Sequence, residues 1–129
     1  MVQEYKVKVY RNKTKWFNME GVLHRIDGPA VEGSDGNKSW WVNGKLHRVD
    51  GPAVESPDGS KSWWVKGKLH RLDGPAYEES NGYNGYKEWW IEGEQLTEEE
   101  FNRKVKPVKE LTVEEISNLL GYEVKIVKS

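Results

Sequence analysis

Three histidines, each followed by an arginine, are the side chains in this sequence with the clearest capacity for chemistry. They are His24, His47 and His70, they lie 23 residues apart, and the sequence has no other histidine. Imidazoles at a regular spacing could ligate a metal, and the neighbouring guanidiniums could bind an anion. Ligands to one zinc ion lie about 2 Å from the metal, whereas equivalent residues on successive two-stranded units lie about 10 Å apart. We therefore predict no metal site and no cofactor.

The arginines that follow the histidines allow two interpretations. Each lies two residues before an aspartate, so an ion pair could shape the "DGP" turn. Alternatively, the His-Arg rows could form a cationic strip that receives phosphates or carboxylates, with tryptophan rings available for base stacking. The identity of the copies favours the structural interpretation, because a small ligand rarely needs three identical sites. The pairs are Arg25 with Asp27, Arg48 with Asp50, and Arg71 with Asp73.

Catalytic motifs are missing from the sequence. It contains no nucleophile elbow, no phosphate-binding loop and no metalloprotease motif. The carboxylates cluster in "TEEEF" at 97–101 and "VEEIS" at 113–117, where capping at the start of a helix explains them. We therefore predict that the protein is not an enzyme.

Length, charge and hydropathy restrict the remaining classes. A length of 129 residues fits a single domain, 1–129, and the lack of cysteine excludes disulfides and thiolate metal sites. A formal net charge of −1 argues against general nucleic-acid binding. No run of 18 apolar residues occurs, and "MVQEYKVKVYRNK" lacks the apolar centre of a signal peptide. We expect a cytoplasmic protein without a membrane partner, located in the host cytoplasm if the protein is viral.

An internal repeat must position the histidines and arginines. The stretch "SWWVNGKLHRVDGPAVE" at 39–55 returns 23 residues later as "SWWVKGKLHRLDGPAYE" at 62–78. The dipeptide Asn43-Gly44 is a strong hairpin signal, because both residues tolerate the positive φ of a type I′ turn. Such a turn pairs Trp41 with Leu46, and it pairs Trp40 with His47. The sequence therefore predicts that each unit forms one hairpin of an antiparallel meander.

The alternation of side chains along these strands assigns the two adjacent tryptophans to different faces. One face would carry Trp40, Val42 and His47, and the other would carry Trp41, Leu46 and Arg48. We expect the second tryptophan of each pair (Trp41, Trp64 and Trp90) to form the core. The first of each pair (Trp40, Trp63 and Trp89) is the better candidate for a contact surface.

The two ends of the chain differ from the repeats. Thr97 with Glu100 and Thr112 with Glu115 form capping-box patterns, which predict two short helices that cover one face of the sheet. The segments "YKVKVY" at 5–10 and "YEVKIVK" at 122–128 alternate like strands that could pair with each other. The predicted fold class is therefore mainly β (α+β): an antiparallel β-hairpin repeat meander of about 23 residues per unit, with a short α-helical and β C-terminal cap. The segments are an N-terminal strand at 1–15, repeats at 16–96, and the helical cap and terminal strand at 97–129.

Two irregularities interrupt the repeat. The first copy, "WFNMEGVLHR", has one extra residue between Trp16 and His24, which requires a longer or bulged turn. The insertion "NGYNGY" at 81–86 adds Tyr83 and Tyr86 before the fourth, incomplete copy at Trp89. Insertions in repeat proteins often map to binding loops, although a tolerated surface insertion explains the sequence equally well.

The motif "W-x-x-G-K-L-H-R-x-D-G-P-A" resembles a MORN repeat over residues 16–96. Its particular form is similar to repeats in small proteins of large tailed phages and, more loosely, to those of YwqK-type antitoxins. The resemblance implies a surface for binding or assembly and brings no catalytic residues. It also implies a phage accessory factor that counters or redirects a host defence or regulatory system.

The sequence therefore predicts a non-catalytic binding protein whose partner is a host protein. Two alternatives stay open: sequestration of a small anionic nucleotide-like signalling molecule, and self-assembly into a homo-oligomeric structural protein. The candidate binding residues are Trp40, Trp63, His47, His70, Arg48, Arg71, Tyr83 and Tyr86.

Overall fold

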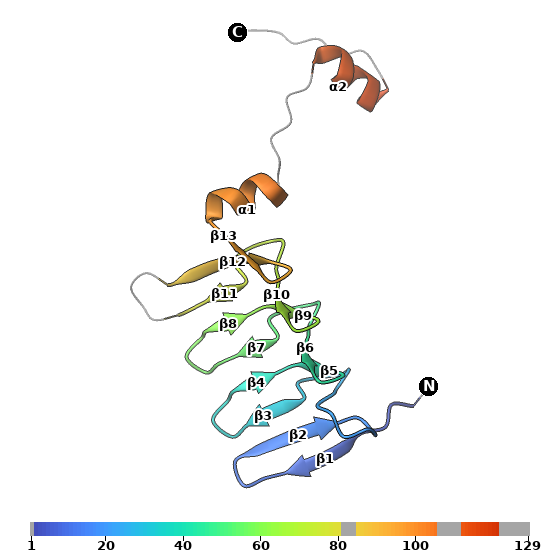
Figure 1. The fold of residues 1–129 in the computed structure, drawn as a ribbon, viewed down its shortest axis with the longest axis vertical. Helices are drawn as coiled ribbons and strands as arrows, with labels where there is room; N and C mark the ends of the chain where they lie inside the picture. The colour runs from blue at the N-terminus through green and yellow to red at the C-terminus, as the bar shows by residue number, and fades with distance from the viewer. Residues whose placement is uncertain (1, 81–84, 106–111, 122–129) are drawn as a thin grey trace.

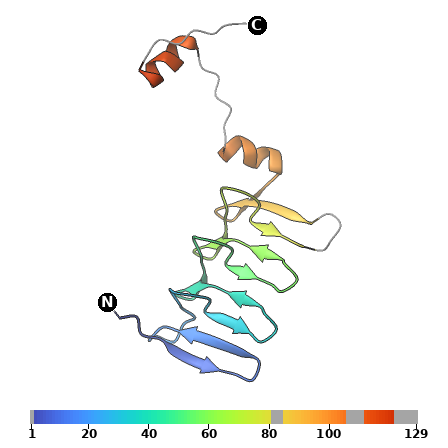
Figure 2. The same ribbon diagram turned by 180° about the vertical axis from the view of Figure 1, so that it is seen from behind.

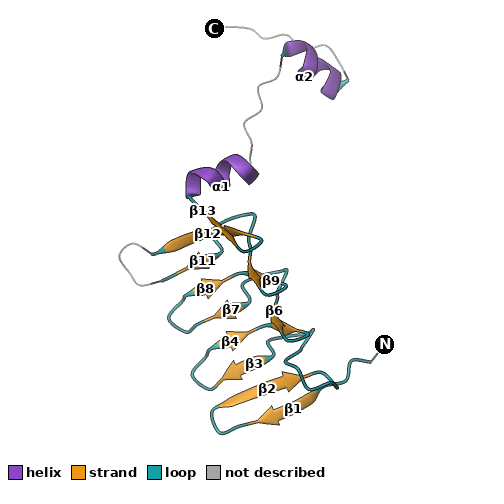
Figure 3. Cartoon of the chain, viewed as in Figure 1, coloured by secondary structure: helices purple, strands orange, loops and turns teal. Residues whose placement is uncertain are grey.

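The computed structural model describes residues 2–80, 85–105 and 112–121, which form antiparallel sheets and two short helices. The strands are β1 (Lys6–Val9), β2 (Lys13–Phe17), β3 (Val31–Gly33), β4 (Lys38–Ser39), β5 (Trp41–Val42), β6 (Lys45–Leu46), β7 (Val54–Glu55), β8 (Lys61–Ser62), β9 (Trp64–Val65), β10 (Lys68–Leu69), β11 (Tyr77–Glu78), β12 (Lys87–Ile91) and β13 (Glu94–Leu96). A nine-stranded sheet has the order β1-β2-β3-β4-β7-β8-β11-β12-β13, and β5-β6 and β9-β10 form two small hairpins. The prediction of a mainly β, antiparallel fold with two helices is confirmed (Figure 3).

The chain alternates between the large sheet and the small hairpins. Figures 1 and 2 show the hairpin tips of the large sheet along one side of an elongated stack and the small hairpins along the other. Trp40 lies between β4 and β5, where the chain leaves the large sheet. Its N–H donates to the Ala53 carbonyl (2.8 Å), and its own carbonyl accepts from the His47 N–H (3.0 Å). Both backbone groups of Trp40 therefore bond to a returning part of the chain, and the strand cannot continue straight.

The small hairpins have the turn that the sequence predicts. Asn43 and Gly44 have φ angles of 49° and 80°, as a type I′ turn requires. The register pairs Trp41 with Leu46 and Val42 with Lys45, as expected. Lys66-Gly67 and Glu92-Gly93 repeat this geometry with φ angles of 51° and 80°, and 49° and 81°. Lys66 and Glu92 thus adopt a left-handed conformation that costs free energy in residues of their type.

The most deeply buried side chains are small ones. Among the described residues, the alanines of the three "DGPA" loops have no exposed surface, and Phe101 is 4% exposed. The expectation that the second tryptophan of each pair forms the core is wrong, because Trp41, Trp64 and Trp90 are only half-buried. The stack is only one repeat unit thick, so protein surrounds a large tryptophan ring on some sides only. An alanine methyl group that lies between successive strands is fully enclosed. The three alanines are Ala30, Ala53 and Ala76.

The helices begin where the capping patterns predict. Helix α1 (Glu98–Val105) starts after Thr97, whose hydroxyl accepts from the Glu100 N–H at 3.1 Å. Helix α2 (Val113–Leu120) has a complete capping box at Thr112. Helix α1 packs on β12 and β13, so it covers the end of the stack (Figure 1) and not one face of the sheet as expected.

The N-terminal strand pairs within the repeat region. Strand β1 runs antiparallel to β2 at the outer edge of the large sheet. The predicted C-terminal strand at 122–128 lies outside the described residues. Across the described ranges, neither helix has the length and apolar character that a membrane span needs.

Candidate functional site

Each arginine of the repeat is held by four kinds of contact, which Arg48 illustrates. Its guanidinium carbon lies 3.8 Å from the centre of the Trp40 ring, so that cation and ring stack. Its Nε donates to Asp50 at 3.0 Å, and its Nη1 donates to the Pro52 carbonyl at 3.0 Å and to Glu55 at 3.2 Å. The same contacts are made by Arg25 on Trp16 and by Arg71 on Trp63.

The predicted Arg–Asp pairs are therefore confirmed, but the predicted face of Arg48 is wrong. The hairpin ladder ends at the Trp41–Leu46 pair, so strict alternation stops before Arg48 and its side chain turns onto Trp40. Gly51 leaves the necessary space, because a Cβ there would lie 3.0 Å from the Arg48 guanidinium carbon. The glycine of "DGP" thus allows the arginine to pack above the turn.

The charge around each guanidinium is negative. One arginine faces two carboxylates, an aspartate and a glutamate, so each cluster carries a formal charge of −1. The hydrogen bond from Arg71 lowers the pKa of Asp73 below its ordinary value, and the positive charge of the guanidinium lowers it further. The arginines are therefore neutralised from within the chain, which disfavours an added phosphate.

The histidines tie each unit to the next one. The Nδ1 atom of His47 accepts a hydrogen bond of 3.0 Å from the Lys66 N–H in the β9–β10 turn. His70 accepts in the same way from Glu92, at 3.0 Å. His24 does so from Asn43 at 2.9 Å, although its own unit has the longer turn. All three imidazoles therefore have the same structural role.

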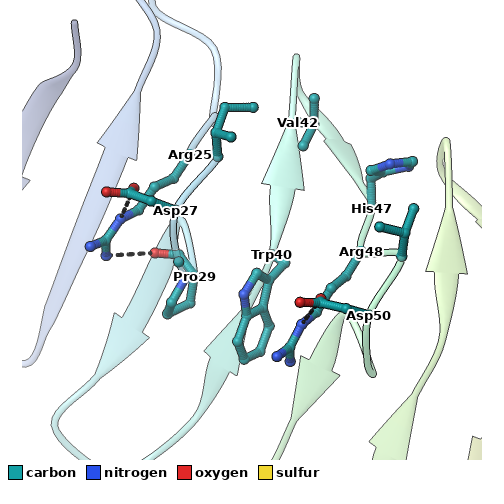
Figure 4. A pocket seen from close by; sticks show the side chains of 11 residues that line it. Arg25, Asp27, Pro29, Trp40, Val42, His47, Arg48 and Asp50 are labelled. Carbon is teal, nitrogen blue, oxygen red and sulfur yellow. Dashed lines mark hydrogen bonds and ion pairs between the residues drawn. The ribbon is translucent and has the colours of Figure 1, made fainter. Parts of the chain in front are cut away.

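Two grooves open between consecutive units. The Trp40 groove, of about 590 Å³, is lined by Trp40, Val42 and His47, with the loops 25–29 and 48–50 on its two sides (Figure 4). The Trp63 groove, of about 800 Å³, is lined by the equivalent residues Trp63, Val65 and His70, between the loops 48–52 and 71–73. The structure thus brings six of the eight candidate binding residues to two equivalent places.

Sequence reasoning missed one set of residues that line the grooves. The position between arginine and aspartate in "HRxDGPA" holds Ile26, Val49 and Leu72, which are 57%, 83% and 55% exposed. We call these three residues the aliphatic row. The signal was available in the sequence, because the variable position is a branched aliphatic residue in every copy. One exposed aliphatic residue is ordinary, but the same exposed aliphatic position in three successive units is informative.

Of the two tyrosines of the insertion, only Tyr86 is described by the structure, and it does not line either groove. Tyr83 lies outside the described residues. Tyr86 precedes β12, and its hydroxyl donates to Glu88 at 2.8 Å, which raises the pKa of the phenol. Its ring is edge-on to that of Tyr77, with centroids 6.2 Å apart. Tyr86 therefore belongs to the β11–β12 hairpin of the large sheet, and Figure 1 shows β11 and β12 on the other side of the stack from β9.

Comparison with known proteins gives no independent assignment of this site. No protein-family model matches the chain. Neither a curated protein nor a solved structure is significantly similar to it.

Proposed function

We propose that this chain is a non-catalytic binding protein that holds a protein partner on the aliphatic row and the two adjacent grooves. The observation that carries this proposal is the exposure of the same kind of apolar side chain on three successive loops. Exposed apolar side chains that gather on one surface mark interaction sites, unlike those scattered singly. Tryptophans lining neighbouring grooves are the kind of residue on which binding energy concentrates.

The polar groups near the grooves favour a protein over an anionic small molecule. Each arginine is already paired with two carboxylates, and a phosphate entering the Trp40 groove would meet the aspartates of both flanking loops. The phosphate and these carboxylates are all negatively charged and would repel each other. Sequestration of a nucleotide-like molecule is therefore the weaker alternative. A second copy of the chain is the other protein partner that this surface could hold.

We also propose that the chain is a MORN-like β-hairpin repeat of about 23 residues per unit. It is then a phage accessory factor that acts in the host cytoplasm on a host protein of a defence or regulatory system. The motif resemblance supports the family and the biological setting. The recurrence of the same arginine contacts in three units supports the repeat.

The test is native mass spectrometry of tagged protein recovered from the cells in which it is naturally made. The variant Val49→Lys/Leu72→Lys charges the aliphatic row, and Val9→Lys on β1, at a position that is 79% exposed, is the matched control. We expect wild type and control to retain one protein partner and the double variant to lose it. Equal retention by all three would overturn the proposal. A bound small anion would favour sequestration, and a doubled chain mass would favour self-association.

A further inference from the structure

The first unit differs from the next two because a tyrosine occupies the place of the groove. Tyr5 packs its ring edge-on against Trp16, with the ring centroids 5.3 Å apart at an angle of 83°. The same ring lies 6.2 Å from His24. Its hydroxyl oxygen accepts a hydrogen bond of 3.1 Å from the Ile26 N–H. One tyrosine thus contacts the tryptophan, the histidine and the aliphatic residue of its unit.

Equivalent residues line both open grooves. Trp40, His47 and Val49 line the first groove. Their counterparts in the next unit, Trp63, His70 and Leu72, line the second groove. The tryptophans also have the same environment, because an arginine stacks on each of the three at 3.7–3.8 Å. The tryptophan, the histidine and the aliphatic residue that Tyr5 contacts are therefore present twice more, each time beside the loop of the preceding unit.

Each open groove contains a backbone N–H that could donate a hydrogen bond to a tyrosine hydroxyl. The Ile26 N–H donates to Tyr5, whereas within the described residues the N–H groups of Val49 and Leu72 have no hydrogen-bond partner. Both residues are exposed, so that water solvates these groups in the free protein. A ligand hydroxyl in the position of Tyr5 would replace that water with a direct bond.

The spacing of the grooves restricts the segment that could fill both. Strands β4 and β8 are separated by β7 in the large sheet, so successive units lie two strand spacings apart, about 9.6 Å. In a polyproline II helix, residues three apart lie on the same side and about 9.3 Å from each other. A β-strand places same-side residues about 6.6 Å or 13 Å apart. Of these two extended conformations, polyproline II has the spacing that fits.

We propose, building on the function proposed above, that each groove binds a tyrosine side chain of the partner. The two grooves together bind a Tyr-x-x-Tyr segment in polyproline II conformation. Each ring contacts the groove tryptophan edge-on, as Tyr5 contacts Trp16, and each hydroxyl accepts from the N–H of Val49 or Leu72.

The direct test is a titration of the full-length protein with the blocked peptide Gly-Ser-Tyr-Pro-Pro-Tyr-Ser-Gly. Calorimetry gives the affinity, and NMR follows the amide protons of Val49 and Leu72. We expect both amide signals to move downfield at saturation. A Tyr-Pro-Tyr peptide, which can fill only one groove at a time, should bind at least about tenfold more weakly. The Phe-Pro-Pro-Phe peptide should bind about three- to tenfold more weakly, without the downfield shift.

Equal affinities for the three peptides, or unmoved Val49 and Leu72 amides at saturation, would overturn the inference. The variant Tyr5→Ala provides a second measurement, because it empties the equivalent place on Trp16. A peptide with three tyrosines at the same spacing should bind this variant at least about threefold more tightly than it binds wild type. Identical affinities would show that the three places are not equivalent.

The peptide titration and the mass spectrometry of the Val49→Lys/Leu72→Lys variant distinguish a wrong tyrosine inference from a wrong binding surface. If the peptides do not bind but charging the aliphatic row still removes the natural partner, the tyrosine inference is wrong and the binding surface stands. If the natural partner is insensitive to Val49→Lys/Leu72→Lys, the surface itself is wrong, whatever the peptides do.

Discussion

The middle units and the terminal unit contain the same tryptophan pair and fold it differently. In the middle units the strand breaks at Trp40 and again at Trp63, whereas β12 runs without interruption from Lys87 to Ile91 through the terminal pair. There, Trp89 pairs with Leu96 in the ladder with β13. The difference lies in the segment after the hairpin turn, because "HRxDGPA" returns the chain in the middle units and "EQL" at 94–96 continues the hairpin in the last.

The comparison shows that the returning loop, and not the tryptophan pair, creates the groove. The loop provides the carbonyl of Ala53, to which the Trp40 N–H donates. It also provides Arg48, which covers the ring of Trp40. The terminal unit lacks such a loop, and helix α1 packs on it with Phe101 buried. Removing loop contacts from a middle unit should therefore have a large effect.

The largest effect is expected for Arg48→Ala. This change removes the stack on Trp40 and three hydrogen bonds, and it leaves Asp50 and Glu55 without their cation. We expect the free energy of unfolding to fall by about 2–3 kcal/mol, measured by urea denaturation. Arg103→Ala, at an exposed position of α1, should change it by less than about 0.5 kcal/mol. Equal losses in the two variants would contradict the structural role of the arginine.

Local features of this fold were predictable from the sequence, and features set by distant parts of the chain were not. The type I′ turn at Asn43-Gly44 follows from two adjacent residues, and the pair of Arg48 with Asp50 from residues two apart. The position where the ladder stops depends on a hydrogen bond to Ala53, which no periodicity reveals. For this reason the face of Arg48 was predicted wrongly.

In the candidate site, too, local features were predictable from the sequence and features set by tertiary structure were not. The tryptophans, histidines and arginines of the grooves were identifiable because their spacing is regular. The exposure of Val49 depends on how the loop is held, and the packing of Tyr5 on Trp16 joins two segments with no common pattern. Both are consequences of tertiary structure. The burial of the "DGPA" alanines is a third, because only the stacking of units encloses them.

An intermediate effect is expected when the hydrogen bond between a histidine and the turn of the next unit is removed. His47→Ala removes the acceptor of the Lys66 N–H, at a turn residue that already has a φ of 51°. We expect a loss of about 1–2 kcal/mol in the free energy of unfolding. His70→Ala should cost roughly half as much. The hairpin that His70 holds has three paired positions and packs against α1, whereas β9–β10 has two paired positions.

Thermal or chemical denaturation of the two variants side by side gives this comparison. A greater loss for His70→Ala than for His47→Ala would contradict the view that the terminal unit is held by its helix. Substitution of His47 by asparagine, which retains a side-chain acceptor, is the control that separates a lost hydrogen bond from lost packing.

The smallest effect concerns pH and the last "HRxDGPA" loop, which joins the middle units to the terminal one. The hydrogen bond from Arg71 lowers the pKa of Asp73 in the folded state. A lowered pKa means that the ionised carboxylate stabilises the fold above the ordinary aspartate pKa of about 3.9, and that this contribution is lost as the pH falls through the folded-state value. Because the Asp73 side chain is 86% exposed, solvent screens the pair, and we expect this contribution to be no more than a few tenths of a kcal/mol.

The free energy of unfolding measured between about pH 5 and pH 2 should therefore decline less steeply in Asp73→Asn than in wild type. The difference between the two should shrink in 1 M salt. Parallel acid profiles at low salt would show that Asp73 contributes nothing through its charge, and that Arg71 is held in that loop by Trp63, the Pro75 carbonyl and Glu78 alone.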